Sequence, residues 1–247
     1  MTGADPAAVQ RWRERIWHDL REVGRPDSRF HWDFSSFIPD FTGSDACADT
    51  LAALPAWQDA GLLFITPDNS TEHVRRRAIR DGKPFLFTTY GIRRGFFHLD
   101  PSSVPAGAVE YAATLDGIES FAEPRTMAGI EAGDRVGLLV TGGSAVARNG
   151  VRFGKGHGYF DLEWALLSSA GAVDSSSLIV DVVHDCQVID QDLTGAGHDV
   201  PVDAIVTPTR VMWVDVPGRK PGWIRWDLLA GSPLATIPPV VELKHRT

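Results

Sequence analysis

The sequence contains few cysteines, no long apolar run and no excess of positive charge. Two cysteines in 247 residues, Cys47 and Cys186, are too few for a disulfide framework or a four-thiolate zinc site. No stretch approaches the roughly 18 consecutive apolar residues that a membrane-spanning helix requires. The net charge of -8 argues against a nucleic-acid-binding surface, because neutralising phosphates requires concentrated Lys and Arg. The segment MTGADPAAVQ lacks the basic-then-apolar order of a secretion signal, so we expect a cytoplasmic protein without membrane or nucleic-acid partners.

Short apolar runs alternate with helical patterns along much of the chain. Apolar residues at helical spacing predict an amphipathic helix over residues 9–23. Further predicted elements are strands at residues 62–66, 85–89, 136–140, 178–183 and 204–207, and helices at residues 72–80 and after Asp161. Because nearly continuous apolar strands in β-α-β order are typical of a sheet buried on both faces, we predict a three-layer α/β/α sandwich with a mainly parallel central sheet. We expect one domain over residues 1–247, with residues 217–247 as an extension packed on it.

The most informative segment, NGVRFGKGHGYFDL, covers residues 149–162. Its centre alternates glycines with polar residues: Gly154, Lys155, Gly156, His157 and Gly158. Glycine loses more backbone entropy on folding than any other residue, so this density indicates backbone that takes a positive φ or approaches a ligand closely. The other interpretation is a glycine-rich turn between a strand and a helix that binds nothing.

The neighbours of these glycines favour an anionic ligand. A helix that starts near Asp161 would offer free backbone N–H groups and the positive end of its dipole, and Arg152 and Lys155 would add mobile positive charge. The Asp161 carboxylate could hold Mg²⁺ near bound phosphates, since Mg²⁺ binds through one or two carboxylates, phosphates and water. The segment therefore predicts a phosphate site.

The spacing excludes better-known phosphate and catalytic motifs. The Rossmann motif has two residues between its second and third glycines, and a Walker loop ends in Gly-Lys-Ser/Thr. Residues 142–146, GGSAV, lack the final glycine of a nucleophile elbow, and no His-Glu-x-x-His helix is present. Phosphoryl transfer needs little covalent chemistry from the protein, so a positioning loop of this kind can suffice.

Residues 152–161, RFGKGHGYFD, resemble the motif Arg-Leu-Gly-x-Gly-x-Gly-Tyr-Tyr-Asp of 5-formyltetrahydrofolate cyclo-ligases, also called methenyltetrahydrofolate synthetases. Downstream, CQV at residues 186–188 and HDVPVDAIVT at residues 198–207 are similar to two further strand elements of that family, in the expected order. The likeness covers residues 134–207. It implies a three-layer α/β fold and the MgATP-dependent cyclisation of 5-formyltetrahydrofolate to 5,10-methenyltetrahydrofolate, in which ATP activates the formyl oxygen.

The resemblance also implies roles for individual residues. Arg152, Lys155 and Tyr159 would be catalytic, and Asp161 would position the metal. The implied ATP-binding residues of the segment are Arg152, Gly154, Lys155, Gly156, His157, Gly158 and Tyr159. The implied cofactors are ATP and Mg²⁺, with a reduced folate or another heterocycle as the small-molecule substrate.

The first helix of the family carries a Lys and an Arg four residues apart that face the phosphates of ATP. Arg11 and Arg15 have this spacing, one turn apart on one helix face, and are the implied ATP-binding pair. Arg13 is an equal competitor. A merely solvated helix face is the other interpretation of these arginines.

The sequence also departs from the family pattern. Phe160 replaces the second Tyr, His157 stands where Gly or Lys is usual, and Leu162 replaces a common Arg; these changes leave phosphate binding intact and bear on folate binding. The N-terminal half is more similar to a paralogous branch of the superfamily, for which a link to thiamine metabolism has been proposed. The similar segments are RIW at 15–17, IPDF at 38–41, LPAW at 54–57, VR at 74–75, GK at 82–83, and WIRW at 223–226 through to IP at 237–238.

Three functional hypotheses follow from these patterns. The first is ATP-dependent cyclisation of 5-formyltetrahydrofolate. The second keeps the MgATP site and changes the acceptor to another heterocyclic metabolite. The third is a catalytically silent nucleotide-binding protein.

A few other residue patterns have simpler interpretations. The pairs His184-Asp185 and His198-Asp199 follow strands and lack a third His, so a metal site is disfavoured for both. His198 and Asp199 are better explained as a turn beside the ligand cleft. Cys186 follows an apolar strand and is better explained as a buried small side chain than as a nucleophile. The four arginines at residues 75–80 could collect phosphates or carboxylates, but a solvated helix face is favoured.

Overall fold

The computed structural model of the chain describes residues 6–133, 135–215 and 220–246. Its central sheet consists of β1 (Leu63–Ile65), β2 (Phe85–Thr88), β3 (Phe96–Leu99), β4 (Glu123–Arg125), β5 (Leu138–Thr141), β8 (Leu178–Val182), β10 (Ala204–Val206) and β11 (Val211–Trp213). The strand order is β11-β10-β8-β5-β1-β2-β3-β4. Strands from β10 to β2 pair in parallel, whereas β11, β3 and β4 pair antiparallel with their inner neighbours. This mainly parallel sheet confirms the predicted fold class.

The parallel strands are the ones that continuous apolar runs predict. Every residue of β1, β2 and β5 is buried, which agrees with a sheet covered on both faces. The antiparallel edge strands were not predicted from the sequence. Strand β4, with the residues Glu-Pro-Arg, is largely exposed and therefore shows no apolar pattern.

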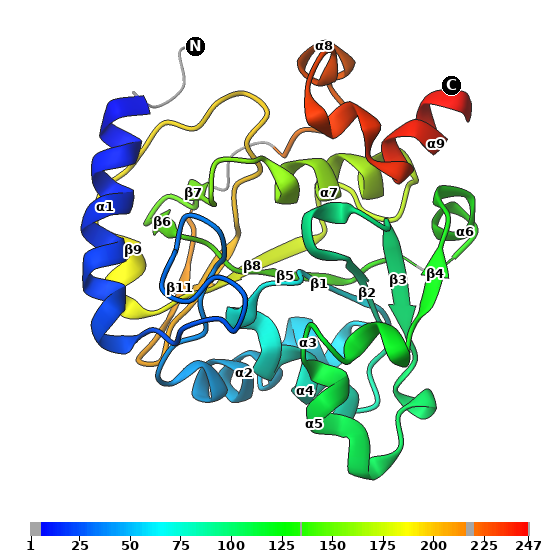
Figure 1. Cartoon of the computed structure of the whole chain (residues 1–247), viewed down its shortest axis with the longest axis horizontal. Helices are drawn as coiled ribbons and strands as arrows, with labels where there is room; N and C mark the ends of the chain where they lie inside the picture. The colour runs from blue at the N-terminus through cyan, green and yellow to red at the C-terminus, as the bar shows by residue number, and fades with distance from the viewer. Residues whose placement is uncertain (1–5, 134, 216–219, 247) are drawn as a thin grey trace.

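Helices cover the two faces of the sheet (Figure 1). One face packs against α2 (Ser44–Ala52), α3 (Pro55–Asp59), α4 (Glu72–Arg80) and α5 (Val109–Ala113). The other face packs against α6 (Met127–Glu131), α7 (Tyr159–Ser169), α8 (Trp226–Leu229) and α9 (Pro238–Arg246). Short 3-10 helices occur at Asn69–Thr71, Tyr90–Ile92, Pro101–Ser103, Ala106–Ala108, Ile118–Ser120, Asp185–Gln187 and Pro233–Thr236. Among the helices described, none has the length and hydropathy needed to cross a bilayer.

A second, three-stranded sheet carries the glycine-rich loop. It consists of β6 (Ala145–Ala147), β7 (Arg152–Phe153) and β9 (Val188–Ile189) in the order β7-β6-β9. Helix α1 (Pro6–Val23), which confirms the first predicted helix, packs against it through Ile16 and Leu20. The sequence did not predict this sheet, because its strands are only two or three residues long.

The C-terminal segment is part of the main core, and is more than a surface extension. Ile224, Leu229, Ile237, Val240 and Leu243 are buried and belong to the cluster that surrounds α7. The first residues of the predicted extension, 217–219, lie outside the described part of the chain, as does residue 134 at the start of the family likeness.

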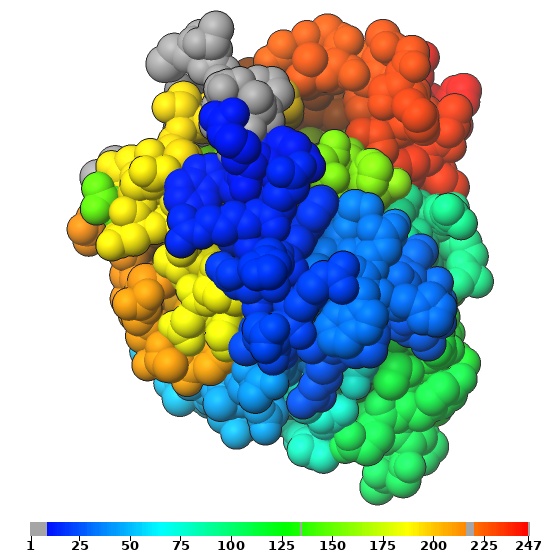
Figure 2. Space-filling model, turned by 60° about the vertical axis from the view of Figure 1, so that its left-hand side comes forward, coloured from blue at the N-terminus to red at the C-terminus, as the bar shows by residue number. Residues whose placement is uncertain are grey.

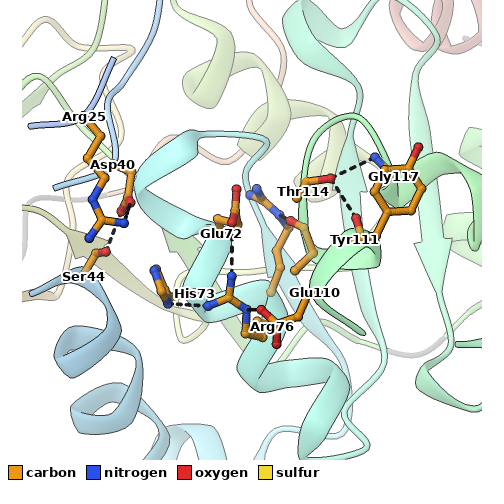
Figure 3. Close-up of polar contacts among 12 residues, drawn as sticks. Arg25, Asp40, Ser44, Glu72, His73, Arg76, Glu110, Tyr111, Thr114 and Gly117 are labelled. Carbon is orange, nitrogen blue, oxygen red and sulfur yellow. Dashed lines mark hydrogen bonds and ion pairs between the residues drawn. The ribbon is translucent and has the colours of Figure 1, made fainter. Parts of the chain in front are cut away.

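Three arginines of α4, Arg76, Arg77 and Arg80, pair with acidic side chains of the protein. Figure 3 shows Arg76 between Glu72, His73 and Glu110, and its Nε lies 2.7 Å from Glu110 Oε2. Arg77 contacts Asp49 and Asp81, and Arg80 contacts Glu110. These arginines therefore link α4 to α2 and α5, and neither sequence interpretation, a ligand-collecting patch or a solvated face, describes them well.

Candidate functional site

A cavity of about 480 Å³ lies at the carboxyl ends of the central strands, beside the N-terminus of α7. Residues that follow β1, β2 and β5 line one side: Thr66, Pro67, Asp68, Tyr90, Gly91 and Gly142. Arg13 of α1, residues 152–163, and side chains from residues 221–234 line the others. The blue N-terminal segment, the yellow-green segment around α7 and the orange C-terminal segment meet on this face of the molecule (Figure 2). The carboxyl ends of parallel strands are the usual ligand site of an open α/β sheet.

The glycine-rich loop connects β7 to α7 along this cavity. Gly156 and Gly158 have φ values of 96° and 68°, a left-handed conformation that other residues adopt only with strain. Gly158 is the N-cap of α7, and no side chain caps the first turn of that helix. Uncapped backbone donors and the positive end of the helix dipole therefore lie at the cavity, which is the arrangement that the sequence predicts for phosphate.

Two cations lie beside the loop. Lys155 Nζ is 4.8 Å from the centre of the Tyr90 ring, so the side chain lies over the cavity side that follows β2. Arg13 donates from Nε to the carbonyl oxygen of Gly154 at 3.1 Å. Burial lowers the pKa of Arg13, but an arginine remains charged at neutral pH. The two side chains place positive charge on both sides of the glycines.

Arg152 is fixed in place, which corrects the prediction of a mobile charge. Its Nη2 donates to the carbonyl oxygen of Gly142 at 2.9 Å, and its guanidinium carbon lies 4.6 Å from the centre of the Phe160 ring. The residue belongs to β7 and is half-buried. The structure thus makes Arg152 a rigid part of the cavity wall.

The structure does not bring the predicted pair Arg11 and Arg15 to the cavity. Arg11 is exposed, and the guanidinium of Arg15 lies 5.3 Å from the centre of the Trp12 ring. Arg13, two residues from each, lies about half a turn around the helix and faces the loop instead. Spacing within one helix cannot show which face points inward when both faces carry arginine.

Two acidic side chains of the first turns of α7 line the cavity. Asp161 Oδ1 accepts a hydrogen bond from the backbone N–H of Val200 at 2.9 Å, and burial raises the pKa of this carboxyl group. Glu163 accepts a hydrogen bond from the Thr88 hydroxyl, and burial raises its pKa to about 8. Glu163 is therefore protonated at neutral pH. We did not predict it, although a Glu within the apolar run of α7 was a visible signal.

A further carboxyl group, Asp181 at the end of β8, lies beneath the cavity. It is fully buried, neither of its oxygens has a hydrogen-bond partner, and burial raises its pKa to about 7. A Cβ added to Gly143 would lie 2.9 Å from Asp181 Oδ2, so this carboxyl group packs directly against the glycine backbone. Asp181 was not predicted as a site residue, because it lies within an inner strand of the sheet.

The carboxylates that line the cavity fit Mg²⁺ in one particular mode. Asp68, Asp161 and Asp199 all line it, but in the described part of the chain no three or more His, Cys, Asp or Glu side chains form a group that could hold a metal ion. Protein ligands alone therefore do not enclose a cation. Mg²⁺ is usually held by one or two carboxylates together with phosphates and water, and this donor set fits that mode.

The other predicted site residues within the segment 152–161 also line the cavity. The Tyr159 hydroxyl would lie 3.4 Å from a Cβ on Gly91, so Tyr159 extends across the opening toward the segment after β2. His157 is exposed, and its ring centre is 5.5 Å from that of Tyr159. The structure thus brings together every predicted site residue of the segment.

Arg75 of α4 positions the cavity side that follows β1. It is fully buried, and its Nη1 donates to the carbonyl oxygens of Thr66 at 3.0 Å and Asp68 at 2.9 Å. Tyr90, on the next segment, donates its hydroxyl to the carbonyl oxygen of Ser36. None of these supports was predicted, since they depend on contacts between segments far apart in the sequence.

The structure argues against a metal site at His184 and a nucleophile at Cys186, but Cys186 is half-buried and not buried as predicted. His184 Nδ1 accepts from the backbone N–H of Cys186 at 3.2 Å and caps a 3-10 helix. Burial raises the pKa of Cys186 to about 11, so its thiol is not an activated nucleophile. His198 and Asp199 form a turn at the cavity, as predicted.

Comparison with known proteins identifies the family to which the chain is similar. Residues 7–208 match the 5-formyltetrahydrofolate cyclo-ligase family. The methenyltetrahydrofolate synthase domain-containing protein of Mus musculus is 34% identical, over 100% of this chain and 66% of its own length. The Homo sapiens protein of the same description is 32% identical, over 98% of this chain and 64% of its own length. The chain thus spans slightly less than two thirds of the length of these relatives.

A solved structure shows the same fold. The NMR structure of Aquifex aeolicus 5,10-methenyltetrahydrofolate synthetase aligns with a TM-score of 0.51 and 19% identity, over 86% of this chain and 95% of that one. The family match covers most of the chain, and the Mus musculus relative aligns with all of it. The chain belongs to the 5-formyltetrahydrofolate cyclo-ligase family.

Proposed function

We propose that the protein is an ATP- and Mg²⁺-dependent cyclo-ligase that converts 5-formyltetrahydrofolate into 5,10-methenyltetrahydrofolate. The observation that carries this proposal is the loop of residues 154–158, whose uncapped helix N-terminus lies in a cavity between Lys155 and Arg13. A triphosphate matches this site, because its negative charge is met by backbone donors, a helix dipole and two cations at once. The proposed cytoplasmic location rests on the sequence alone.

The reaction requires phosphoryl transfer followed by ring closure. The formyl oxygen attacks the γ-phosphorus of ATP, and ADP leaves. N10 then attacks the formyl carbon, and inorganic phosphate leaves with the former formyl oxygen as the five-membered ring closes. Mg²⁺ would neutralise phosphate charge during the first step.

The residues of this chain would act mainly by positioning and by neutralising charge. Lys155 and the 156–158 backbone bind the phosphates, and Asp161 supplies a carboxylate for Mg²⁺. Arg152, fixed on the Gly142 carbonyl, contributes a charge that does not reorient during the reaction. Tyr159 covers the cavity from the α7 side and limits the access of water.

The test is absorbance of the methenyl product after 5-formyltetrahydrofolate and MgATP are mixed with the purified protein. Lys155→Ala should weaken MgATP binding at least about tenfold, since it removes a charged partner of phosphate, and should abolish most turnover. Arg148→Ala is the matched control, because Arg148 follows β6, is exposed and pairs with Asp192 outside the cavity. Equal effects of the two substitutions, or no absorbance with an active folate control enzyme, would reject this function.

A second candidate keeps the MgATP site and uses a different heterocycle as acceptor. It is favoured by one observation: part of the cavity wall comes from residues 221–234, beyond the family match at residues 7–208. Stimulation of ATP consumption by a non-folate heterocycle, with folates inert, would support it. Nucleotide-dependent thermal stabilisation with no turnover on any acceptor would instead indicate a silent nucleotide-binding protein.

A further inference from the structure

The cavity has an apolar wall that the phosphate chemistry does not use. It is formed by six side chains of the C-terminal segment: Pro221, Trp223, Ile224, Leu228, Leu229 and Leu234. All six lie beyond residue 208, where the match to the family ends. The loop side and this wall enclose the same cavity, so a ligand on one is adjacent to a ligand on the other.

The wall is held firmly on α7. Trp164 Nε1 donates to the carbonyl oxygen of Pro221 at 2.6 Å, and Ser168 Oγ donates to that of Gly222 at 3.0 Å. Just before it, the buried Lys220 Nζ lies 2.6 Å from Asp203 Oδ2 at the sheet. These contacts fix the backbone of the wall before any ligand arrives, which lowers the entropy lost on binding.

The chemistry of the wall suits a flat ring. Trp223 is 64% exposed and Leu228 is 47% exposed, although both line the cavity, while Ile224 and Leu229 are buried behind them. Exposed apolar side chains supported from behind and next to a polar site are typical of a ligand pocket. An indole face also binds planar rings well by stacking.

Among the described residues of the wall, one carries a positive charge, and this charge is already paired. It therefore does not favour a phosphate at the wall. Arg225 lines the cavity, but its Nη2 lies 2.6 Å from Asp227 Oδ2, which neutralises its charge. Positive charge that is available to an anion is concentrated at the loop, with Lys155 and Arg13. The two sides of the cavity therefore differ in the ligand chemistry they accept.

We propose that residues 221–234 form the acceptor subsite, in which Trp223 and Leu228 contact a flat ring of the heterocyclic second substrate and so determine which acceptor is used. This inference rests on the proposed function, because it places the triphosphate at the loop. The adenine ring of ATP is the competing occupant, and the experiment separates the two.

The test measures the binding of three probes to the full-length protein by calorimetry: MgATP, magnesium tripolyphosphate and 5-formyltetrahydrofolate. Trp223→Ala should weaken 5-formyltetrahydrofolate binding at least about tenfold, a loss expected for one stacked ring, and should leave both phosphate probes unchanged. Trp223→Phe, which keeps a flat ring, should restore most of the affinity. Leu228→Ala should weaken the same probe to a smaller extent.

Trp213→Ala is the matched control. Trp213 is 52% exposed on β11 and does not line the cavity, so its removal should change none of the three affinities. Thermal unfolding of each variant without ligand shows whether the fold is retained.

Several other outcomes would overturn the inference or the proposed function. Weaker binding of MgATP but not of tripolyphosphate to Trp223→Ala would place adenine at the wall. Unchanged binding of all probes, or no 5-formyltetrahydrofolate binding by the wild type, would remove the acceptor subsite. Turnover by Trp223→Ala at the wild-type rate and KM would reject this inference and leave the proposed function intact. Folate binding that depends on Trp223 but leads to no turnover would reject the proposed function and leave the wall as a binding site.

Discussion

Two glycine-containing segments meet at the cavity, and glycine has a different role in each. A Cβ added to Gly142 would lie 2.2 Å from Ser70 Oγ, and one added to Gly143 would lie 2.9 Å from Asp181 Oδ2. In the loop, a Cβ on Gly156 would have no neighbour closer than 3.6 Å, and one on Gly158 would have none within 4 Å. The first segment needs glycine because neighbouring atoms leave no room. The loop needs it because the backbone turns left-handed in open space.

The difference separates a structural from a binding role. The crowded segment needs glycine for its own packing, although Gly142 also lines the cavity. Packing does not require the left-handed backbone of Gly156 and Gly158, and phosphate binding is the proposed reason for it. Sequence alone presents both as glycine-rich turns after short strands.

The largest expected effect concerns the buried carboxyl group under the crowded segment. Burial raises the pKa of Asp181 from 3.8 to about 7, so the folded protein keeps a proton that the unfolded chain releases. Its contribution to stability is therefore full below the unfolded pKa and is lost as the pH rises through about 7. In Asp181→Asn this loss should disappear, a difference on the order of 3 kcal/mol in urea unfolding between acidic and mildly alkaline pH.

Asp27→Asn provides the contrasting control for this titration. Hydrogen bonds from Arg29 and Asn69 outweigh burial and lower the pKa of Asp27 to about 2. Its stabilising contribution is lost only as the pH falls through that low value, so the Asn variant should be less stable by a constant amount from about pH 5 to about pH 8. A parallel pH dependence in wild type and Asp181→Asn would contradict the prediction.

The next effect tests crowding directly. Gly142→Ala should lower the free energy of unfolding by about 2 kcal/mol, because its methyl group would collide with Ser70 and press on Ile38. Gly154→Ala should cost much less, since its Cβ would meet only the Arg152 side chain at 3.6 Å. The double variant Ser70→Ala, Gly142→Ala should recover part of the loss. If chemical denaturation showed equal destabilisation by the two single glycine variants, the proposed difference in crowding between the two segments would be wrong.

A smaller effect separates strain from binding at the two ends of α7. Gly158 and Gly171 have φ values of 68° and 70°, and a Cβ on either would meet no atom within 4 Å. Each Gly→Ala variant should therefore lose about 1 kcal/mol of stability. Only Gly158→Ala should also weaken MgATP binding, by about fivefold, because it alters the helix terminus that faces the phosphates. Identical MgATP affinities in calorimetry would mean that the loop is not the phosphate site.

The smallest effect concerns the arginines of α1. Arg13→Ala should weaken MgATP binding about threefold to fivefold, since Arg13 donates to the loop backbone. Arg15→Ala removes the same charge from the same helix and should leave the affinity unchanged. If Arg15→Ala had the larger effect, the pair inferred from the family pattern would be correct.

The sequence was sufficient for the parts of the fold that depend on local pattern. The five parallel strands were predictable because strands buried on both faces are continuously apolar, and α4 because its apolar residues follow helical spacing. The antiparallel strands β3, β4 and β11 were not, since they are only partly buried and pair as strands only through distant partners. The small sheet was not predicted either, because its strands have only two or three residues.

For the candidate site, too, only features that depend on local sequence pattern could be predicted. Residues 152–161 were identifiable because glycine density and the family motif are both local features. Arg13, Glu163, Asp181 and Arg75 depend on which face of an element points inward and on contacts between distant segments, neither of which a single sequence contains. Trp223 was noticed only as part of a family likeness, because the wall is created by how the C-terminal segment docks.

One helix carries both halves of the cavity. The N-terminus of α7 faces the loop, while Trp164 and Ser168 of the same helix hold the backbone of Pro221 and Gly222. From Tyr159 to Ser168 the axis advances about 14 Å, a length that thermal motion hardly changes. If the helix shifts, the glycine-rich loop and the wall of residues 221–234 therefore move together, and the distance between these two sides of the cavity stays the same.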